Sequence, residues 1–275
     1  MDVKQREFNK VSTYIVLIIF SLIAVFPIYW TVQTSFKARF LTFAVPPKWI
    51  FHPTFENYYN LFTKSDVVSR LINSLIIGIL STLLSVVMGA LAAFSFARLK
   101  IARKKDIMFW ILSTRMIPPI TTLIPLFLFF RAIGLYDTHF GVIMFYTAFN
   151  LPLVIWVMRS FIVEIPLEIE ECAMIDGCSR WGVFWKITLP LTMPALFATG
   201  ALSFILCWNE FMGALILTSH NAVTLPVLAM SFISAKGVVW GEMTAGATVI
   251  IVPVVIFVVL FQKYLVKGLS FGLLK

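Results

Sequence analysis

A polar pair flanked by two aromatic residues lies inside a long apolar run and is the part of this sequence most suited to ligand chemistry. It reads Trp208-Asn209-Glu210-Phe211. Ionisable side chains are costly inside an apolar span and usually mark a pathway or a pairing. Aromatic faces stack against sugar rings, and amide and carboxylate groups accept hydrogen bonds from hydroxyl groups. We therefore expect these four residues to line a path for a polyhydroxylated ligand; the alternative is a polar contact between helices.

Two further polar residues stand in similar surroundings. Arg115 is followed closely by Pro118 and Pro119, which predict a break or kink because proline lacks the N–H that continues a helix. Arg115 either lines the same path or braces the broken helix by donating to the carbonyl groups that the break frees. Asn150, which precedes Pro152, is a further candidate for the path or a helix-kink residue.

The sequence lacks the motifs of common catalytic centres. It contains no G-x-x-x-x-G-K-[ST] phosphate-binding loop, so we expect ATP hydrolysis to reside in a separate protein. No cluster of His, Cys and carboxylate residues has the spacing of metal ligands, and an odd number of cysteines argues against a disulfide framework. We expect Cys172, Cys178 and Cys207 to be small apolar fillers. The chain is thus predicted to be no enzyme and to hold no metal or cofactor of its own.

The segment 159–188 is the most charged part of the chain and carries clear signals for helix ends. Pro166 suits the first turn of a helix. The carboxylates that follow would lie at the positive end of the helix dipole; they are Glu168, Glu170 and Glu171. Gly177 can adopt the left-handed conformation that ends a helix, and Ser179 can cap a second helix. We predict two short exposed helices at a sharp angle, after which Pro190 opens the next long helix.

The elements that must position these residues are long apolar helices. Apolar residues make up 60% of the chain and charged residues 13%, whereas soluble domains carry about 25% charged residues. A helix needs about 20 mostly apolar residues to cross a bilayer. The sequence therefore predicts an all-α membrane protein in a lipid bilayer. Its six expected transmembrane helices are Val11–Phe36, Leu71–Ala97, Ile107–Phe130, Phe140–Met158, Leu189–Thr218 and Thr244–Tyr264.

Basic residues predict the orientation of these spans, because Lys and Arg concentrate in cytoplasmic loops. The densest group lies between the second and third spans and consists of Arg98, Lys100, Arg103, Lys104 and Lys105. Both termini are therefore expected in the cytoplasm. Since the net charge of +9 comes from clusters beside apolar runs, we expect no nucleic-acid binding. The first span is expected to be retained, and we divide the chain into an N-terminal span with its outer loop (1–70) and a core of five spans (71–275).

The charged segment resembles the EAA loop of binding-protein-dependent ABC importer permeases. The match consists of Glu171-Cys172-Ala173, three further residues, Gly177, nine further residues and Ile187-Thr188-Leu189-Pro190; Cys172 replaces the first alanine of the family's triplet. In that family this loop is a coupling helix that docks into the ATPase subunit. The resemblance implies this role for Glu171, Cys172, Ala173, Asp176, Gly177, Arg180, Ile187, Leu189 and Pro190.

Other segments, among them Asn73-Ser74-Leu75 and 134–138, resemble the maltose-type carbohydrate branch of this family. The resemblance implies a type I importer permease fold in a bacterial or archaeal cytoplasmic (inner) membrane, forming half of the path for a carbohydrate or polyol. The implied partners are a second homologous permease, two ABC ATPase subunits that hold ATP and Mg, and an extracytoplasmic solute-binding protein.

Two alternatives stay open at this point. The same machinery could carry another small solute, such as an amino acid or a phosphonate. A stand-alone secondary transporter is the other alternative, although ion-coupled carriers usually place several carboxylates near the middle of the bilayer. This chain offers essentially Glu210 there.

Overall fold

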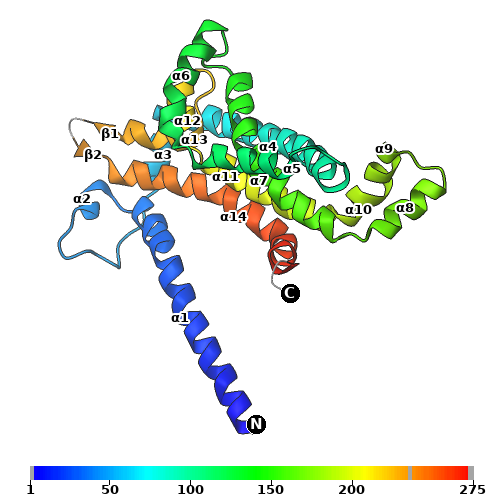
Figure 1. Cartoon of the computed structure of the whole chain (residues 1–275). Helices are drawn as coiled ribbons and strands as arrows, with labels where there is room; N and C mark the ends of the chain where they lie inside the picture. The colour runs from blue at the N-terminus through cyan, green and yellow to red at the C-terminus, as the bar shows by residue number, and fades with distance from the viewer. Residues whose placement is uncertain (1–2, 235–236, 272–275) are drawn as a thin grey trace. The chain divides into compact units, whose positions relative to one another are not determined.

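The computed structural model describes residues 3–234 and 237–271, most of them in helices, and the chain divides into two compact units (Figure 1). One unit contains the residues up to 67 together with 229–251, and the other contains 68–228 together with 252 onward. Residues 229–251 thus cluster with the N-terminal part of the chain.

The first unit is built on α1 (Val3–Ser35), α2 (Arg39–Thr42), α3 (Glu56–Lys64) and the beginning of α14 (Trp240–Phe271). A 3-10 turn, η3 (Ala229–Phe232), leads into a two-stranded antiparallel ribbon of β1 (Ile233–Ser234) and β2 (Gly237–Val238), in which Ile233 pairs with Val238. The side-chain amide of Asn57 donates to the carbonyl groups of Ser35 and Lys37, at 2.8 Å each, and so holds the chain that leaves α1 against α3.

The second unit contains the remaining helices. They are α4 (Val67–Arg98), α5 (Lys104–Ser113), η1 (Thr114–Met116), α6 (Pro119–Ala132), α7 (His139–Glu164), α8 (Leu167–Ile175), α9 (Arg180–Val183), η2 (Phe184–Thr188), α10 (Leu189–Leu191), α11 (Met193–Asn209), α12 (Met212–Leu217), α13 (Leu225–Leu228) and the later part of α14.

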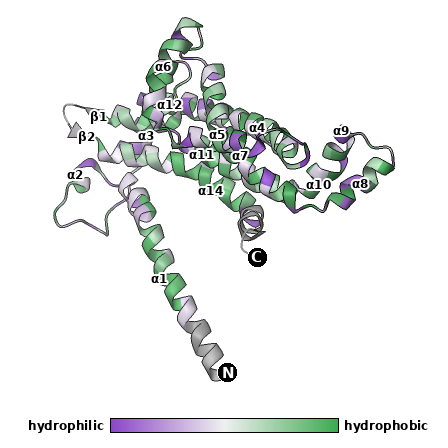
Figure 2. Cartoon of the chain, viewed as in Figure 1, coloured by the Kyte–Doolittle hydropathy of each residue, from purple (hydrophilic) through white to green (hydrophobic). Residues whose placement is uncertain are grey.

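Four helices of the described residues are each long and apolar enough to cross a membrane. They are Ser12–Ser35, Val67–Arg98, His139–Glu164 and Trp240–Lys263. Two bent helix pairs bring the number to as many as six if each pair counts as one span. Figure 2 shows hydrophobic residues along most of α1 and α14 and hydrophilic residues on α8 and α9. This distribution confirms a multi-pass helical membrane protein.

The predicted third and fifth spans are not single helices. Lys104–Met116 and Pro119–Ala132 meet at 92°, because Pro118 and Pro119 interrupt the chain of backbone hydrogen bonds as predicted. Arg180–Leu191 and Met193–Asn209 meet at 76°. The long helix of this region therefore begins at Met193 rather than at the predicted Leu189.

The core of the second unit lies where α4, α7 and α11 pack against one another. One buried cluster near the end of α4 contains Ala90, Ala93, Val154, Met158, Ile162, Phe184 and Ala195. The ring of Phe184 lies 5.1 Å from that of Phe94, centroid to centroid. This contact anchors the charged segment between α7 and α11 to the membrane-spanning helices, since Phe184 belongs to that segment and Phe94 to α4.

Candidate functional site

The first predicted helix of the charged segment is α8, and its end has the geometry that the sequence predicts. Pro166 precedes the helix with extended backbone angles, and α8 starts at Leu167. Gly177 has a φ of +88°, the left-handed region that favours glycine. The backbone N–H of Cys178 donates to the carbonyl of Ala173 at 2.9 Å, and that of Gly177 to Met174 at 3.1 Å. This is the Schellman pattern of a helix C-terminus.

The second predicted helix is α9, and it continues into a π-helix. The Ser179 hydroxyl accepts a hydrogen bond from the backbone N–H of Gly182 at 3.2 Å, which confirms the predicted cap. The backbone N–H of Leu189 then reaches back five residues to the carbonyl of Phe184. Proline has no N–H and its ring collides with the carbonyl four residues earlier, so Pro190 favours this wider turn. Single π-turns of this kind are frequent at functional sites.

The residues predicted to couple the loop to a partner differ in exposure. Six of the nine are exposed: Glu171, Cys172, Asp176, Gly177, Arg180 and Pro190. Ala173 is buried, and Ile187 and Leu189 are half-buried. Two large apolar side chains join the exposed face, Ile175 at 85% and Trp181 at 63% exposure. An exposed surface that combines charge with large apolar groups suits a protein partner.

The structure corrects the interpretation of the cysteines as apolar fillers. Cys172 is exposed and Cys178 is half-buried, both in the charged segment, and Cys207 alone of the three is buried. Cys207 moreover takes part in polar contacts, since the amide nitrogen of Asn150 donates to its sulfur at 3.0 Å. No group of three or more potential metal ligands occurs among the described residues.

A buried ion pair joins α4 to α8, and the sequence did not predict it. The Nε of Arg98 lies 2.7 Å from the Oε2 of Glu170, and the side chains are 8% and 5% exposed. The hydroxyl of Thr188 donates to the Oε1 of the same carboxylate at 2.9 Å. The pattern predicted only a favourable helix-dipole position for Glu170. Its spacing of three residues from Ala173, which puts both on one face of α8, is the signal that could have indicated burial.

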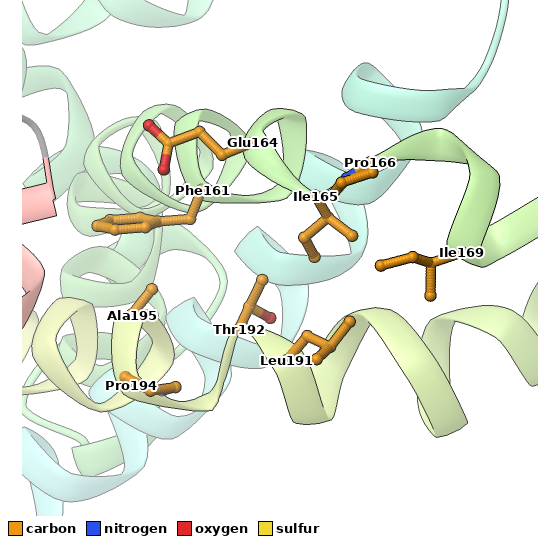
Figure 3. Close-up of a pocket in the computed structure, with 9 residues that line it drawn as sticks. All are labelled: Phe161, Glu164, Ile165, Pro166, Ile169, Leu191, Thr192, Pro194 and Ala195. Atoms are coloured by element: carbon orange, nitrogen blue, oxygen red, sulfur yellow. The ribbon is translucent and has the colours of Figure 1, made fainter. Parts of the chain in front are cut away.

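An apolar pocket of about 290 Å³ opens beside the loop, between the end of α7 and the α10–α11 corner. Figure 3 shows Ile165 and Pro166 on one side and Leu191 and Thr192 on the other, with Ile169 of α8 at the end of the pocket. The loop is therefore not tightly packed against α10 on this side.

At the break between α5 and α6, Arg115 approaches α7. Its guanidinium carbon lies 4.3 Å from the centroid of the Phe149 ring, and Nη2 donates to the Oδ1 of Asn150 at 3.3 Å. The bracing interpretation predicts hydrogen bonds from Arg115 to freed carbonyl groups, but the hydrogen bond from its Nη2 goes to an amide side chain instead. Its buried Nε has no hydrogen-bond partner among the described residues.

Asn150 links this guanidinium to α11. It is 1% exposed, and its amide nitrogen donates to the carbonyl of Tyr146 and to the sulfur of Cys207, at 3.0 Å each. The structure thus brings together Arg115 and Asn150, two of the residues predicted for the path, and adds Phe149 and Cys207. The types of these two added residues, an aromatic and a thiol in apolar runs, carry no functional signal in the sequence.

Glu210 lies where α11 ends, and its carboxylate caps the next helix. Both carboxylate oxygens accept from the backbone N–H of Gly213 at 3.0 Å, and Oε2 also accepts from Ala214 at 3.3 Å. The Tyr146 hydroxyl donates to the backbone carbonyl of Glu210 at 3.0 Å. Because carboxylates favour the positive end of a helix, this local pairing satisfies a charge inside an apolar region.

The four predicted residues 208–211 do not share one face. Trp208 is 2% exposed and its ring lies 5.6 Å from that of Phe204, inside the unit. Asn209 is exposed, and its amide donates to the carbonyl of Ile205. Glu210 and Phe211 are half-buried. In this conformation the indole of Trp208 has no face free for a sugar ring, because packing of α11 turns it toward the core.

A carboxylate clamp joins the loop before α7 to the loop after α12. Asp137 accepts hydrogen bonds from four successive backbone N–H groups, those of residues 219–222. Burial raises the pKa of the Asp137 carboxyl, but the backbone N–H groups together outweigh it and lower the pKa to about 2. A carboxylate that accepts several backbone hydrogen bonds is stabilised in its charged form.

Known proteins resemble the chain over most of its length. A model of the family described as "Binding-protein-dependent transport system inner membrane component" matches residues 85–271. The trehalose/maltose transport system permease protein MalG of Thermococcus litoralis is 36% identical over 276 residues, covering 99% of each chain. The trehalose transport system permease protein SugB of Mycobacterium tuberculosis is 40% identical over 225 residues, covering 81% of this chain and 82% of that protein.

A solved structure agrees with the fold. A chain from the crystal structure of a bacterial ABC transporter involved in the import of the acidic polysaccharide alginate superimposes with a TM-score of 0.76. The superposition covers 96% of this chain and 98% of that one, at 23% sequence identity.

Proposed function

Because this chain belongs to the family of binding-protein-dependent transport system inner membrane components, we propose that it is the permease subunit of an ATP-driven importer of a carbohydrate. One observation carries the proposal: a relative named for trehalose and maltose transport matches 99% of the chain, and one named for trehalose transport matches 81% of it. Members of the family are transport permeases rather than enzymes, so the chain supplies a path across the membrane.

The importer also needs subunits that this chain does not contain. We propose a second, homologous permease that completes the path, two ABC ATPase subunits that bind ATP and Mg, and an extracytoplasmic solute-binding protein. A binding protein is supported by the fold likeness to an alginate importer that has been crystallised with its substrate-bound periplasmic protein. In the proposed topology the bent pair of α5 and α6 is one span, and α11 with the residues that follow it to Thr218 supplies another, while α9 stays in the docking segment outside the membrane. The resulting six spans put both termini on the cytoplasmic side, where the basic cluster after α4 favours them.

The exposed face of α8 and α9 is the proposed docking surface for an ATPase subunit. It includes the charged residues Glu171 and Arg180 and the exposed side chain of Ile175. The turn at Gly177 directs the chain back toward the membrane helices. In the proposed mechanism, closure of the ATPase pair moves this surface and thereby opens and closes the path.

The proposed substrate path runs past the break at Arg115. The guanidinium, the amide of Asn209 and the carboxylate of Glu210 are the groups suited to sugar hydroxyls. Asn150 positions Arg115. The buried ring of Trp208 packs beneath the residues that line the path, and Phe211 lies next to Glu210 in the sequence. Selectivity for one sugar over another is assigned chiefly to the binding protein.

The experiment is to purify the protein from its native membrane through a tag at its N-terminus and to identify what accompanies it by mass spectrometry. We expect an ATPase subunit and a second permease. The binding protein of the same importer is then screened against sugars, polyols, amino acids and phosphonates, and ATP-dependent uptake of the ligand found is measured in proteoliposomes. Recovery of this chain alone, with uptake in the absence of ATP, would contradict the proposal and indicate a secondary carrier.

A further inference from the structure

The buried ion pair of Arg98 and Glu170 joins parts of the chain that are far apart in sequence. Arg98 is the last residue of α4, Glu170 lies in α8, and Thr188 ends η2. The carboxylate is shared, with Oε2 at 2.7 Å from the Arg98 Nε and Oε1 at 2.9 Å from the Thr188 hydroxyl. Both oxygens of one buried carboxylate therefore point to partners on different elements.

The same guanidinium also holds the end of α7. Nη2 of Arg98 donates to the carbonyl groups of Ile162 and Ile165, at 2.8 and 2.9 Å. These carbonyls lie in the last turn of α7 and just after it, where the helix supplies few further N–H donors; that of Ile162 also accepts from the backbone N–H of Ile165 at 3.2 Å. The planar guanidinium presents several donors in a fixed geometry, so one side chain connects α4, α7 and α8.

Apolar packing alone does not hold α8 in place. Its outer residues are exposed, and the pocket of about 290 Å³ lies between its residue Ile169 and the α10–α11 corner (Figure 3). On its inner face Ala173 and Glu170 are buried. Directional hydrogen bonds to a buried charge are stronger than neutral ones, and here they define the position of α8 relative to α4.

We propose that Arg98, Glu170 and Thr188 form a positioning lock that makes the α8 surface move as one body with the end of α4. The inference rests on the proposed function, because it assigns to this lock the transmission of motion from the ATPase to the membrane helices. Arg98, Glu170 and Thr188 are positioning residues: they touch neither the substrate nor the ATPase surface. The adjacent Glu171, which is exposed, serves the docking face instead.

The test measures the distance between α8 and α4 in the purified complex by electron–electron double resonance. One spin label is attached to a cysteine at Leu167, which is 52% exposed on α8 and lies outside the proposed coupling residues, and the other to a cysteine at Met88, which is 50% exposed and lies about 15 Å along α4 from Arg98. Cys172→Ala, Cys178→Ala and Cys207→Ser remove the native thiols. Distances are recorded without nucleotide and after trapping with Mg-ATP and vanadate.

We expect one narrow distance distribution that is the same in both states. Thr188→Val, which keeps the shape but removes the hydroxyl, and Glu170→Gln are expected to broaden it or to add a second population after trapping. Thr188→Ser retains the hydroxyl and is expected to restore the narrow distribution. The matched controls are Glu168→Gln, on the same helix and exposed, and Thr199→Val, whose buried hydroxyl has no partner among the described residues.

Removing one partner of a buried pair can prevent folding, whereas replacing both with apolar residues is often tolerated. The double variant Arg98→Met with Glu170→Met therefore provides a second test, and we expect it to broaden the distribution as well. A wild-type distance that changes on trapping would overturn the proposal, as would variants that keep the wild-type distribution. If no ATPase accompanies the chain, the proposed function fails, while the nucleotide-free distributions still decide whether the lock positions α8.

Discussion

The carboxylate of Glu210 lies within hydrogen-bond distance of the Gly213 backbone nitrogen through both of its oxygens, at 3.0 Å each. The charge of Glu210, at the junction of α11 and α12, is thereby stabilised by a backbone N–H only three residues further along the chain. The close approach depends on the absence of a side chain at Gly213, where a Cβ atom would overlap the Phe145 ring and lie 2.9 Å from the Glu210 Oε2.

Gly213→Ala is therefore expected to destabilise the protein by about 1–3 kcal/mol, the usual cost of an overpacked site. The measurement is the thermal unfolding midpoint of the purified protein in detergent. Gly200→Ala on α11 is the matched control, because its Cβ would meet the Val86 side chain at an ordinary 3.6 Å. Equal midpoints for the two variants would show that the geometry around Gly213 relaxes without cost.

Gly177→Val is expected to weaken coupling while leaving the membrane helices folded. The left-handed conformation at this residue, with a φ of +88°, costs about 1–2 kcal/mol for a residue with a side chain, and the turn after α8 would be displaced. We expect the ATP hydrolysis stimulated by the loaded binding protein to fall. The control is Gly182→Ala, which changes the same loop at an unstrained position where a Cβ has room. Stimulation at the wild-type level in Gly177→Val would contradict the coupling role of this turn.

Arg115→Lys separates the two interpretations of this residue, lining the path or bracing the break. Lysine lacks the planar group that lies over Phe149 and reaches Asn150. A hydrogen bond from a charged group to a ligand contributes about 1.5–3 kcal/mol, so we expect the KM for sugar uptake to rise at least about tenfold, with little change in the unfolding midpoint. The control is Arg131→Lys, which is exposed at the end of α6. A lowered midpoint with unchanged KM would identify a brace.

The clamp at Asp137 is expected to persist at mildly acidic pH. Its pKa is lowered to about 2 from the ordinary value of 3.8, so its contribution to stability is complete above the ordinary value and is lost as the pH falls through about 2. Hydrogen exchange at residues 219–222, corrected for intrinsic rates, should stay slow at pH 4 and become fast near pH 2.

Asp137→Asn is expected to speed this exchange already at neutral pH, because an amide accepts through one oxygen instead of two. Asp66→Asn, at an exposed position, should leave the exchange unchanged. Protection of residues 219–222 that is independent of both pH and the substitution would show that other contacts hold the loop.

Much of the fold could be predicted because its signals are local. The length of an apolar run decides whether a helix can cross a bilayer, and four such helices stand close to where they were expected. The left-handed Gly177, the Ser179 cap and the break at Pro118 depend on residues within one or two turns of chain, so their types alone predicted them. The fifth span was misplaced, because the bend before Met193 and the end of α11 at Asn209 depend on how the neighbouring segments are capped and packed.

The sequence by itself determined that this is a multi-pass helical membrane protein with an exposed charged loop, since hydropathy and helix-end preferences act over short distances. Tertiary structure alone decided which polar groups meet. Glu170 and Glu171 are neighbours of the same type, yet the rotation of α8 buries the first against Arg98 and exposes the second. In the same way, packing of α11 directs Trp208 into the core and brings Cys207 to Asn150. Such pairings depend on the relative rotation of helices far apart in sequence, which no local preference specifies.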